Sequence, residues 1–146
     1  MLPGSKQVIL GLDLGTVTCG VALCDPTGLI ASPVETVRFA DEDYVACLKQ
    51  VVAIIDQKKA ETVVLGLPKH MNGDVGIRGQ ASIHFKKMIE EVRPAVKVVL
   101  LDERLTTVSA NRTMLASNMN RAKRKAMVDQ MAAVEILQSY LDSQRR

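Results

Sequence analysis

The stretch VILGLDLGTVTCGVALC, residues 8–24, decides the fold that this chain is expected to adopt. Its first part, Val8–Leu14, is apolar and β-branched on both faces, which is typical of a central strand buried on two sides. Gly20–Asp25 predicts a second strand, and the turn residues Asp25-Pro26-Thr27-Gly28 precede a third at Leu29–Thr36. Such short links favour antiparallel pairing, so the chain is expected to open with a three-stranded meander.

Beyond residue 40 the apolar residues recur at helical spacing, and strands alternate with helices. An acidic run at 41–43 marks the start of a helix, because acids are favoured at helix N-termini. The elements expected after the meander are a helix with apolar positions Val45, Leu48, Val52 and Ile55, a strand Glu61–Leu67, a helix with the stripe Ile77, Ala81, Phe85, Met88 and Val92, a strand Val96–Leu101, and helices over about Thr107–Ala116 and Lys125–Leu141. This order predicts an α/β fold of the ribonuclease-H-like type, a five-stranded mixed sheet (three antiparallel strands, then parallel ones) with helices on both faces.

The composition is that of a globular protein, with 47% hydrophobic and 24% charged residues in a chain of 146. No linker, repeat or low-complexity tract divides it, so residues 1–146 are expected to form one ribonuclease-H-like domain. Positive charge gathers in the C-terminal part. Residues 1–84 carry seven bases and nine acids (net −2), whereas residues 85–146 carry twelve bases and seven acids (net +5). This asymmetry points to a polyanionic partner.

The sequence also indicates where the chain works. Its longest uncharged apolar runs are strand-length, far short of a membrane span. The N-terminal residues lack the basic region and the cleavage site of a secretory signal. The three cysteines, Cys19, Cys24 and Cys47, form no C-x-x-C pair and are expected to be reduced and buried. We therefore expect a cytoplasmic protein without membrane contact.

Acidic residues at three places are the candidates for catalysis. Asp13 lies in a strand expected to be buried on both faces, where a carboxylate is costly unless it is paired or binds metal. Gly11 is expected to leave open space beside it. Asp102 and Glu103 end the last strand, and at most one of them shares the face of Asp13, because adjacent strand residues point to opposite faces. Asp129 lies in the final helix, one turn before two alanines whose small side chains keep its surroundings open.

Carboxylates that converge cannot all stay ionised without cations between them. Oxygen ligands without Cys or His select Mg²⁺ or Mn²⁺, and two such ions about 4 Å apart would promote in-line hydrolysis of a phosphodiester. The sequence contains no nucleophilic serine elbow, zinc-protease motif or phosphate-loop lysine. Each acid alone can also be structural, least so Asp13, and this prediction therefore depends on their convergence.

Several motifs of the chain resemble the YqgF family, the RuvX-type ribonuclease-H-like proteins. They are GLDLGT (11–16), GVAL (20–23), LGLPKHMNG (65–73), LDERLTT (101–107) and VDQMAAVEILQSYLDS (128–143). The resemblance implies a nuclease that completes the 5′ end of 16S ribosomal RNA, or a Holliday junction resolvase. It also implies that Asp13, Glu103 and Asp129 are the catalytic, metal-binding carboxylates, with Asp102 in support.

The same resemblance implies that Thr106 and Thr107 hold the loop of Glu103. One position departs from the family pattern: Val17 stands where the family commonly has a lysine. A lysine there could contact phosphate, so this change leaves the substrate preference open.

Candidate substrate contacts lie in two segments. Before Asp129 the sequence concentrates the bases Arg121, Lys123, Arg124 and Lys125, which suit phosphate contacts that position nucleic acid without reading its sequence. Lys69 and Asn72 follow a strand end and are expected to line the same groove. With two Phe, two Tyr and no Trp, a stacking platform for single strands is not expected. The expected partner is therefore structured RNA or branched DNA.

Three functions stay open at this point. The first is a metal-dependent nuclease, using Mg²⁺ or Mn²⁺ as a pair of ions, that processes the 5′ end of pre-16S rRNA during ribosome biogenesis. The second is a Holliday junction resolvase acting on branched DNA. The third is an RNA-binding ribosome assembly factor without catalysis. The sequence is compatible with a monomer or a homodimer.

Overall fold

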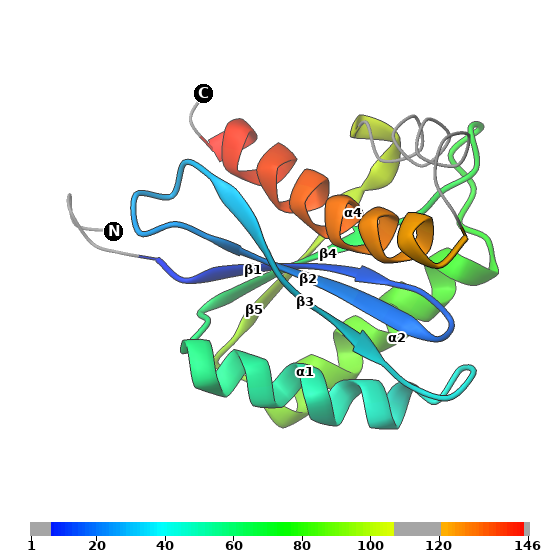
Figure 1. Cartoon of the computed structure of the whole chain (residues 1–146), viewed down its shortest axis with the longest axis horizontal. Coiled ribbons are helices and arrows are strands. Elements are labelled where there is room, and N and C mark those ends of the chain that lie inside the picture. Colours follow the sequence, from blue (N-terminus) through cyan, green and yellow to red (C-terminus); the bar gives the residue numbers. More distant parts are fainter. Residues whose placement is uncertain (1–6, 107–120, 145–146) are drawn as a thin grey trace.

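A computed structural model of the chain describes residues 7–106 and 121–144, apart from the side chains of residues 105, 121–127 and 129. It confirms the expected five-stranded mixed sheet, whose strand order is β3-β2-β1-β4-β5 (Figure 1). The elements are β1 (Ile9–Leu14), β2 (Thr18–Cys24), β3 (Ala31–Arg38), α1 (Tyr44–Lys58), β4 (Thr62–Leu67), α2 (Ile77–Val92), β5 (Lys97–Asp102), the 3₁₀ turn η1 (Glu103–Leu105) and α4 (Arg121–Gln144).

Strand β1 lies at the centre of the sheet, and all six of its residues are buried. It pairs antiparallel with β2 and parallel with β4, as its apolar residues on both faces predict. The meander is confirmed too, although β2 begins and β3 ends two residues beyond the expected bounds. Its turn is held by Asp25, whose carboxylate accepts hydrogen bonds from the backbone N–H groups of Leu29 and Ile30 at 2.9 and 3.0 Å.

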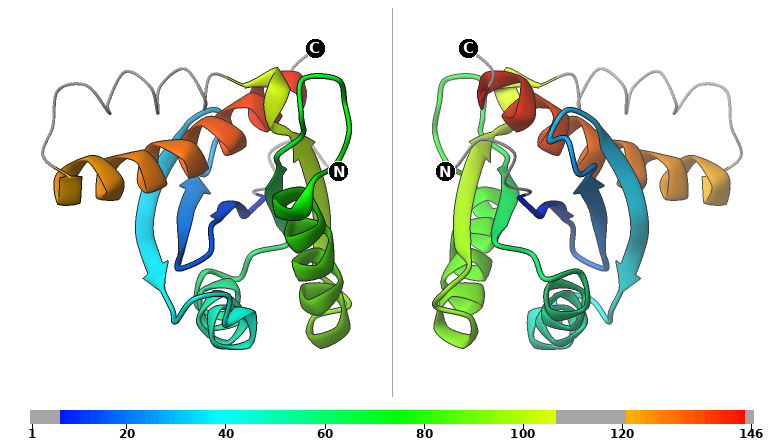
Figure 2. Two further views of the ribbon diagram at one scale, coloured as in Figure 1. Left: turned by 90° about the vertical axis from the view of Figure 1, so that its right-hand side faces the viewer. Right: turned by 90° about the vertical axis from the view of Figure 1, so that its left-hand side faces the viewer.

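The two faces of the sheet are covered differently (Figure 2). Of the helices that the structure describes, α4 packs across β1, β2, β3 and β4 on one face, while α1 and α2 cover the other. The α4 face is lined by small or medium side chains, among them Ile9, Ala22, Val64, Ala133 and Leu137. The opposite face holds the larger core, with Leu10, Leu12, Leu65, Phe85 and Ile89. Alternate residues of β1 therefore belong to different cores, which decides the direction of Asp13.

The expected helical stripes of α1 and α2 are confirmed at Ile55 and Phe85, which are buried, and are wrong at their first positions. Val45 and Ile77 were expected to face the core, but they are 58% and 84% exposed. The buried residues of α1 are Cys47, Val51, Ile54 and Ile55, and those of α2 are Gly79, Ser82, Phe85 and Ile89. Both stripes were drawn through an apolar residue in the first helical turn, and in each helix this residue is exposed.

The C-terminal helix begins at Arg121, four residues earlier than expected. The helix expected at 107–116 lies outside the described residues, and Thr107 with it. None of the three cysteines forms a disulfide, and all three are buried, as expected. Among the described residues, no helix is both long and apolar enough to span a membrane.

Candidate active site at the ends of β1 and β5

Asp13 lies on the face of β1 that α4 covers. Gly11, two residues earlier on the same face, contacts this helix so closely that a Cβ at Gly11 would lie 2.6 Å from Cβ of Leu137. The space at Gly11 is therefore filled by α4, and our expectation that it stays open beside Asp13 is wrong. Asp13 itself is only 7% exposed. Burying a carboxylate on a central strand costs free energy unless the group is paired or binds metal, so the position of Asp13 points to one of these roles.

Glu103 reaches the same face of the sheet from the end of β5. A Cβ at Gly66 of β4 would lie 2.9 Å from Oε2 of Glu103 and 2.5 Å from Cδ1 of Ile136. Because Ile136 belongs to α4, the Glu103 carboxylate stands between the sheet and this helix. Only a glycine at position 66 leaves the room that the carboxylate occupies.

Asp13 and Glu103 come together through the strand register. The parallel pairing of β1 with β4 includes Leu12↔Leu65, so Asp13 and Gly66 are the next positions along these strands. Neighbouring strands lie about 4.8 Å apart. The carboxylate of Glu103, placed over Gly66, is thus one strand away from that of Asp13. On its other side Asp13 pairs with Gly20 of β2, which has no side chain to intervene.

Asp102 points away from the face that Asp13 and Glu103 share. Of the two acids at the end of β5, Glu103 is therefore the one on the face of Asp13. It aligns with Leu67 of β4, one position beyond Gly66, and its carboxylate accepts 2.7 and 3.1 Å hydrogen bonds from the guanidinium of Arg104. Lys69 lies 3.7 Å from the same carboxylate. The hydrogen bonds from Arg104, and then its charge and that of Lys69, lower the pKa of Asp102 to about 2. Asp102 is therefore an ion-pairing residue that organises the loop beside Glu103.

Thr106 holds Glu103 in place, as expected. The backbone N–H and the hydroxyl of Thr106 both donate to the carbonyl oxygen of Glu103, at 3.2 and 2.9 Å. The Asp102 carboxylate accepts from the backbone N–H of Arg104 at 2.9 Å and caps the same short turn from the other side. The turn that directs Glu103 toward the sheet is thus fixed at both ends.

The third carboxylate, Asp129, has its side chain outside the described part of the chain. Its backbone position is informative, because α4 runs antiparallel to β1 over the candidate site. Ile9 lies in the same pocket lining as Leu141, and Gly11 contacts Leu137 and the carbonyl oxygen of Ala133. Continuing by one turn brings position 129 toward the Asp13 end of β1. Ala132 and Ala133, its neighbours one turn on, are buried.

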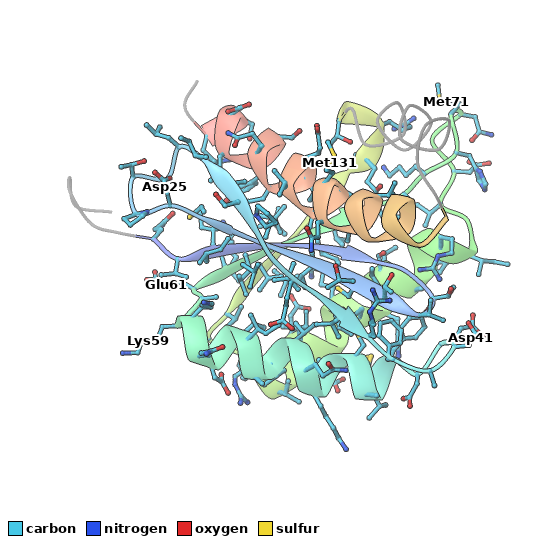
Figure 3. All side chains as sticks on the ribbon, viewed as in Figure 1. Asp25, Asp41, Lys59, Glu61, Met71 and Met131 are labelled. Atoms are coloured by element: carbon cyan, nitrogen blue, oxygen red, sulfur yellow. The ribbon has the colours of Figure 1, made fainter. Side chains whose placement is uncertain are left out.

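The loop between β4 and α2 is ordered by its own side chains. Asn72, for which substrate contact stays a prediction, bonds Asp74 within this loop: its Nδ2 donates to the Asp74 carboxylate at 3.1 Å and its Oδ1 accepts from the Asp74 N–H at 3.0 Å. Lys69 lines a pocket of about 510 Å³ between this loop and the start of α2. Met71 stands at the loop tip, 90% exposed and far from the Asp25 turn (Figure 3).

The basic residues before Asp129 lie in the first turns of α4, of which only Lys125 was expected to be helical. The side chains of Arg121, Lys123, Arg124 and Lys125 lie outside the described part. Their positions are still unusual, because the N-terminus of a helix favours acids and the first turn of α4 has none. Four cations there carry an electrostatic cost, which suggests that they serve a purpose other than helix stability.

Arg78 is a residue of this region that sequence reasoning did not single out. It lies in the first turn of α2, and its guanidinium donates to the carbonyl oxygen of Leu14, directly after Asp13, at 3.0 Å. A second donor reaches the hydroxyl of Tyr44 at 2.9 Å. No pattern in the sequence points to it, since the contact depends on how α2 packs against the end of β1.

Oxygen donors are what this site offers a cation. In the part of the chain whose side chains are described, no group of three or more His, Cys, Asp and Glu residues gathers closely enough to hold a metal ion. Asp13 and Glu103 contribute two carboxylates there. This donor set, on the face of the sheet that α4 covers, fits a hard divalent cation such as Mg²⁺ or Mn²⁺.

Comparisons with known proteins point to one family. The family model described as "RuvX: Holliday junction resolvase" matches residues 7–143. A protein of Staphylococcus epidermidis named "Putative pre-16S rRNA nuclease" is 46% identical over 138 residues, which cover 94% of this chain and 97% of that protein. A Staphylococcus aureus protein with the same name is 45% identical over the same shares.

Solved structures share the fold at low sequence identity. The RuvC protein of Thermus thermophilus, solved in complex with a Holliday junction substrate, has a TM-score of 0.63 and 13% identity over 95% of this chain and 96% of that one. The fowlpox virus Holliday junction resolvase has a TM-score of 0.58 and 13% identity over 94% and 99%. These likenesses show that the sheet and its helices follow the architecture of ribonuclease-H-like resolvases.

Proposed function

The chain belongs to the RuvX family, and we propose that it is a metal-dependent nuclease that hydrolyses phosphodiester bonds in structured nucleic acid. The observation that carries the proposal is the meeting of Asp13 and Glu103 across Gly66, on the face of the sheet that α4 covers. Asp129, at the turn of α4 nearest the Asp13 end of β1, is proposed as the third carboxylate.

In this proposal Asp13, Glu103 and Asp129 hold one or two divalent cations, Mg²⁺ or Mn²⁺. A bound ion of this kind supplies charge stabilisation for the phosphorane-like transition state and makes a bound water more acidic. The chain provides the rest. The carboxylates of the buried Asp13 and the half-buried Glu103 confine the reaction to one point. Thr106 and Asp102 fix the turn that carries Glu103, and no serine or cysteine nucleophile is required.

Nucleic acid is proposed to approach this site from the side of the β4–α2 loop and the start of α4. Lys69 and the four bases at the start of α4 lie at that end of the molecule and suit phosphate oxygens. Contacts of this kind recognise the shape of a folded backbone. Whether one copy of the chain or two copies bind the nucleic acid then depends on the substrate.

The substrate we propose is the 5′ end of pre-16S rRNA, processed in the cytoplasm during ribosome biogenesis. The support is the 46% identity, over nearly the whole chain, to relatives that carry this activity in their name. Branched DNA is the second candidate, favoured by the description of the matching family model. A junction resolvase must cut two strands symmetrically, which favours two copies of the chain.

The test is cleavage of a 5′-extended 16S rRNA precursor and of a four-way DNA junction, with Mg²⁺ or Mn²⁺. The wild type is compared with Asp13→Asn, Glu103→Gln and Asp129→Asn. The control is Glu61→Gln, which neutralises an exposed acid at the start of β4, the other end of the strand from the site (Figure 3). We expect the wild type and the control to trim the RNA, and the three site variants to lose this activity.

Other outcomes separate the alternatives. Cutting of the junction but not of the RNA would assign the resolvase function. RNA binding by the wild type without cleavage of either substrate, under both metals, would contradict the nuclease and favour the assembly factor. Equal activity of the wild type and Asp13→Asn would show that the carboxylates are not catalytic.

A further inference from the structure

The guanidinium of Arg78 joins three elements that are distant in the sequence. It lies in the first turn of α2, donates to the carbonyl oxygen of Leu14 at the end of β1, and donates to the hydroxyl of Tyr44 at the start of α1. The C-terminal end of β1 and the N-terminal ends of α1 and α2 lie on the same side of the molecule (Figure 1). Arg78 is half-buried among them.

The carbonyl that Arg78 binds is one that the sheet does not satisfy. The N–H of Gly15 donates to Thr18 at 2.7 Å, toward β2. Because alternate residues of an antiparallel pair direct their peptide groups to the partner, the peptide groups of Leu14 point to the other edge, toward β4. The pairing with β4 runs from Ile9↔Thr62 to Leu12↔Leu65, so Leu14 lies beyond it. Arg78 supplies the donor that β4 does not.

This contact matters for Asp13 because Asp13 lies between the last residue paired with β4 and Leu14. The Asp13 carboxylate on β1 and the Glu103 carboxylate, which stands over Gly66 of β4, carry like charges, and their repulsion tends to separate the ends of β1 and β4. Helix α2 follows β4 through its loop, so a bond from α2 to Leu14 ties the two strand ends together. The guanidinium acts through the backbone, since α2 covers the face opposite to Asp13.

We propose that Arg78 is a positioning residue for the nuclease reaction, which holds the Asp13 end of β1 at the place where its carboxylate meets that of Glu103. The inference rests on the proposed function. It differs from a phosphate-contact role, in which Arg78 would bind substrate directly, and from a purely structural role, in which its loss would only lower stability.

The experiment compares Arg78→Gln and Arg78→Lys with a matched control, Arg93→Gln. Arg93 ends the same helix and bonds the Asp56 carboxylate of α1 at 2.8 and 2.6 Å, at the far end of α2 from the site. Both glutamine variants remove an arginine that links α2 to α1. Only Arg78→Gln releases the end of β1.

Two readouts are measured on each protein. The first is steady-state cleavage of the RNA precursor, for which we expect Arg78→Gln to lower kcat about 10- to 100-fold with little change in KM, as for a group displaced by about 1 Å. The second needs no cleavage: it is the rise in Tm that Mn²⁺ produces in the free protein, with Asp13→Asn as the negative control. We expect Arg78→Gln to need more Mn²⁺ for the same rise.

Arg78→Lys should recover part of both readouts, because one ammonium can donate to Leu14 without reaching Tyr44 at the same time. If Arg78→Gln does not fold, the comparison is made on Arg78→Lys, for which an unchanged kcat would contradict the proposal. A fall in kcat of Arg78→Gln no greater than that of Arg93→Gln would contradict the proposal as well. A raised KM with unchanged kcat and a weaker salt dependence would make Arg78 a phosphate contact. Absence of cleavage by the wild type would refute the proposed function, while the Mn²⁺ readout would still test Arg78.

Discussion

The carboxylate of Glu103 lies over Gly66, with Oε2 only 2.9 Å from the point where a Cβ of residue 66 would stand. A residue at the end of β5 thereby occupies space that belongs to β4, and it reaches the strand next to Asp13. This close approach converts two acids that are 90 positions apart in the sequence into neighbours on one face of the sheet.

Gly66→Ala tests this relationship directly. The new methyl group would overlap the Glu103 carboxylate and the end of the Ile136 side chain, both of which can rotate away. We expect the nuclease activity to fall about 100-fold, because misplacing a catalytic group by about 1 Å has an effect of that size. The free energy of unfolding should fall by about 1 kcal/mol, at the lower end of overpacking costs. Cleavage assays and urea unfolding on the same preparation measure the two. Full activity would show that the position of Glu103 is not critical.

Gly11→Ala should lower the free energy of unfolding more than Gly66→Ala does. Its methyl group would lie 2.6 Å from Cβ of Leu137 and 2.9 Å from the carbonyl oxygen of Ala133, and neither can move without the helix. We expect the free energy of unfolding to fall by about 2–3 kcal/mol, at the upper end of overpacking costs. Urea unfolding measures it. A loss smaller than that of Gly66→Ala would mean that α4 does not pack on β1 as described.

Asp102→Asn tests the ion-pairing role of that residue through pH. The pKa of Asp102 in the folded protein is about 2, below the value of about 3.9 for an unfolded chain, because Arg104 donates hydrogen bonds to its ionised form. A lowered pKa contributes stability that is complete above the unfolded pKa and is lost as the pH falls through the folded one. The wild type should therefore be more stable than Asp102→Asn at pH 7.

The difference in Tm between these two proteins should shrink between about pH 4 and pH 2. Calorimetry over this range gives the measurement. A difference that stays constant down to pH 2 would show that the Asp102 charge is not what stabilises the fold. Asp25, whose pKa is also about 2 through hydrogen bonds from the Thr27 hydroxyl and the backbone of its turn, lies far from the site, so Asp25→Asn should leave cleavage unchanged.

The basic start of α4 predicts a salt effect. If Lys123 and Arg124 each neutralise one phosphate, the double change Lys123→Gln and Arg124→Gln should reduce the slope of log K against log salt by about 1.5–2. The helix should be no less stable, because cations at its N-terminus oppose the macrodipole. Binding titrations between 50 and 300 mM KCl with catalytically silent Asp13→Asn as the background measure the slope. An unchanged slope would remove these residues from the nucleic-acid surface.

The sequence by itself determined the order of the elements and the sheet. The apolar run of β1, the turn at Asp25 and the change of apolar period after residue 40 are local signals, and local signals give strand and helix types and their order. The sequence also limited the carboxylate that shares the face of Asp13 at the end of the last strand to either Asp102 or Glu103, because neighbouring strand residues face opposite ways whatever the tertiary structure. The family motifs then favoured Glu103.

Only the tertiary structure decided which space each residue uses. Gly11 was expected to give room to Asp13, yet α4 fills that room, and it is Gly66 of another strand that admits Glu103. Arg78 gained its contact with Leu14 from the packing of α2 against the end of β1. Such contacts join residues 37 to 126 positions apart. Periodicity describes one element at a time, so it cannot foresee where two elements approach closely enough for a side chain to fit or be excluded.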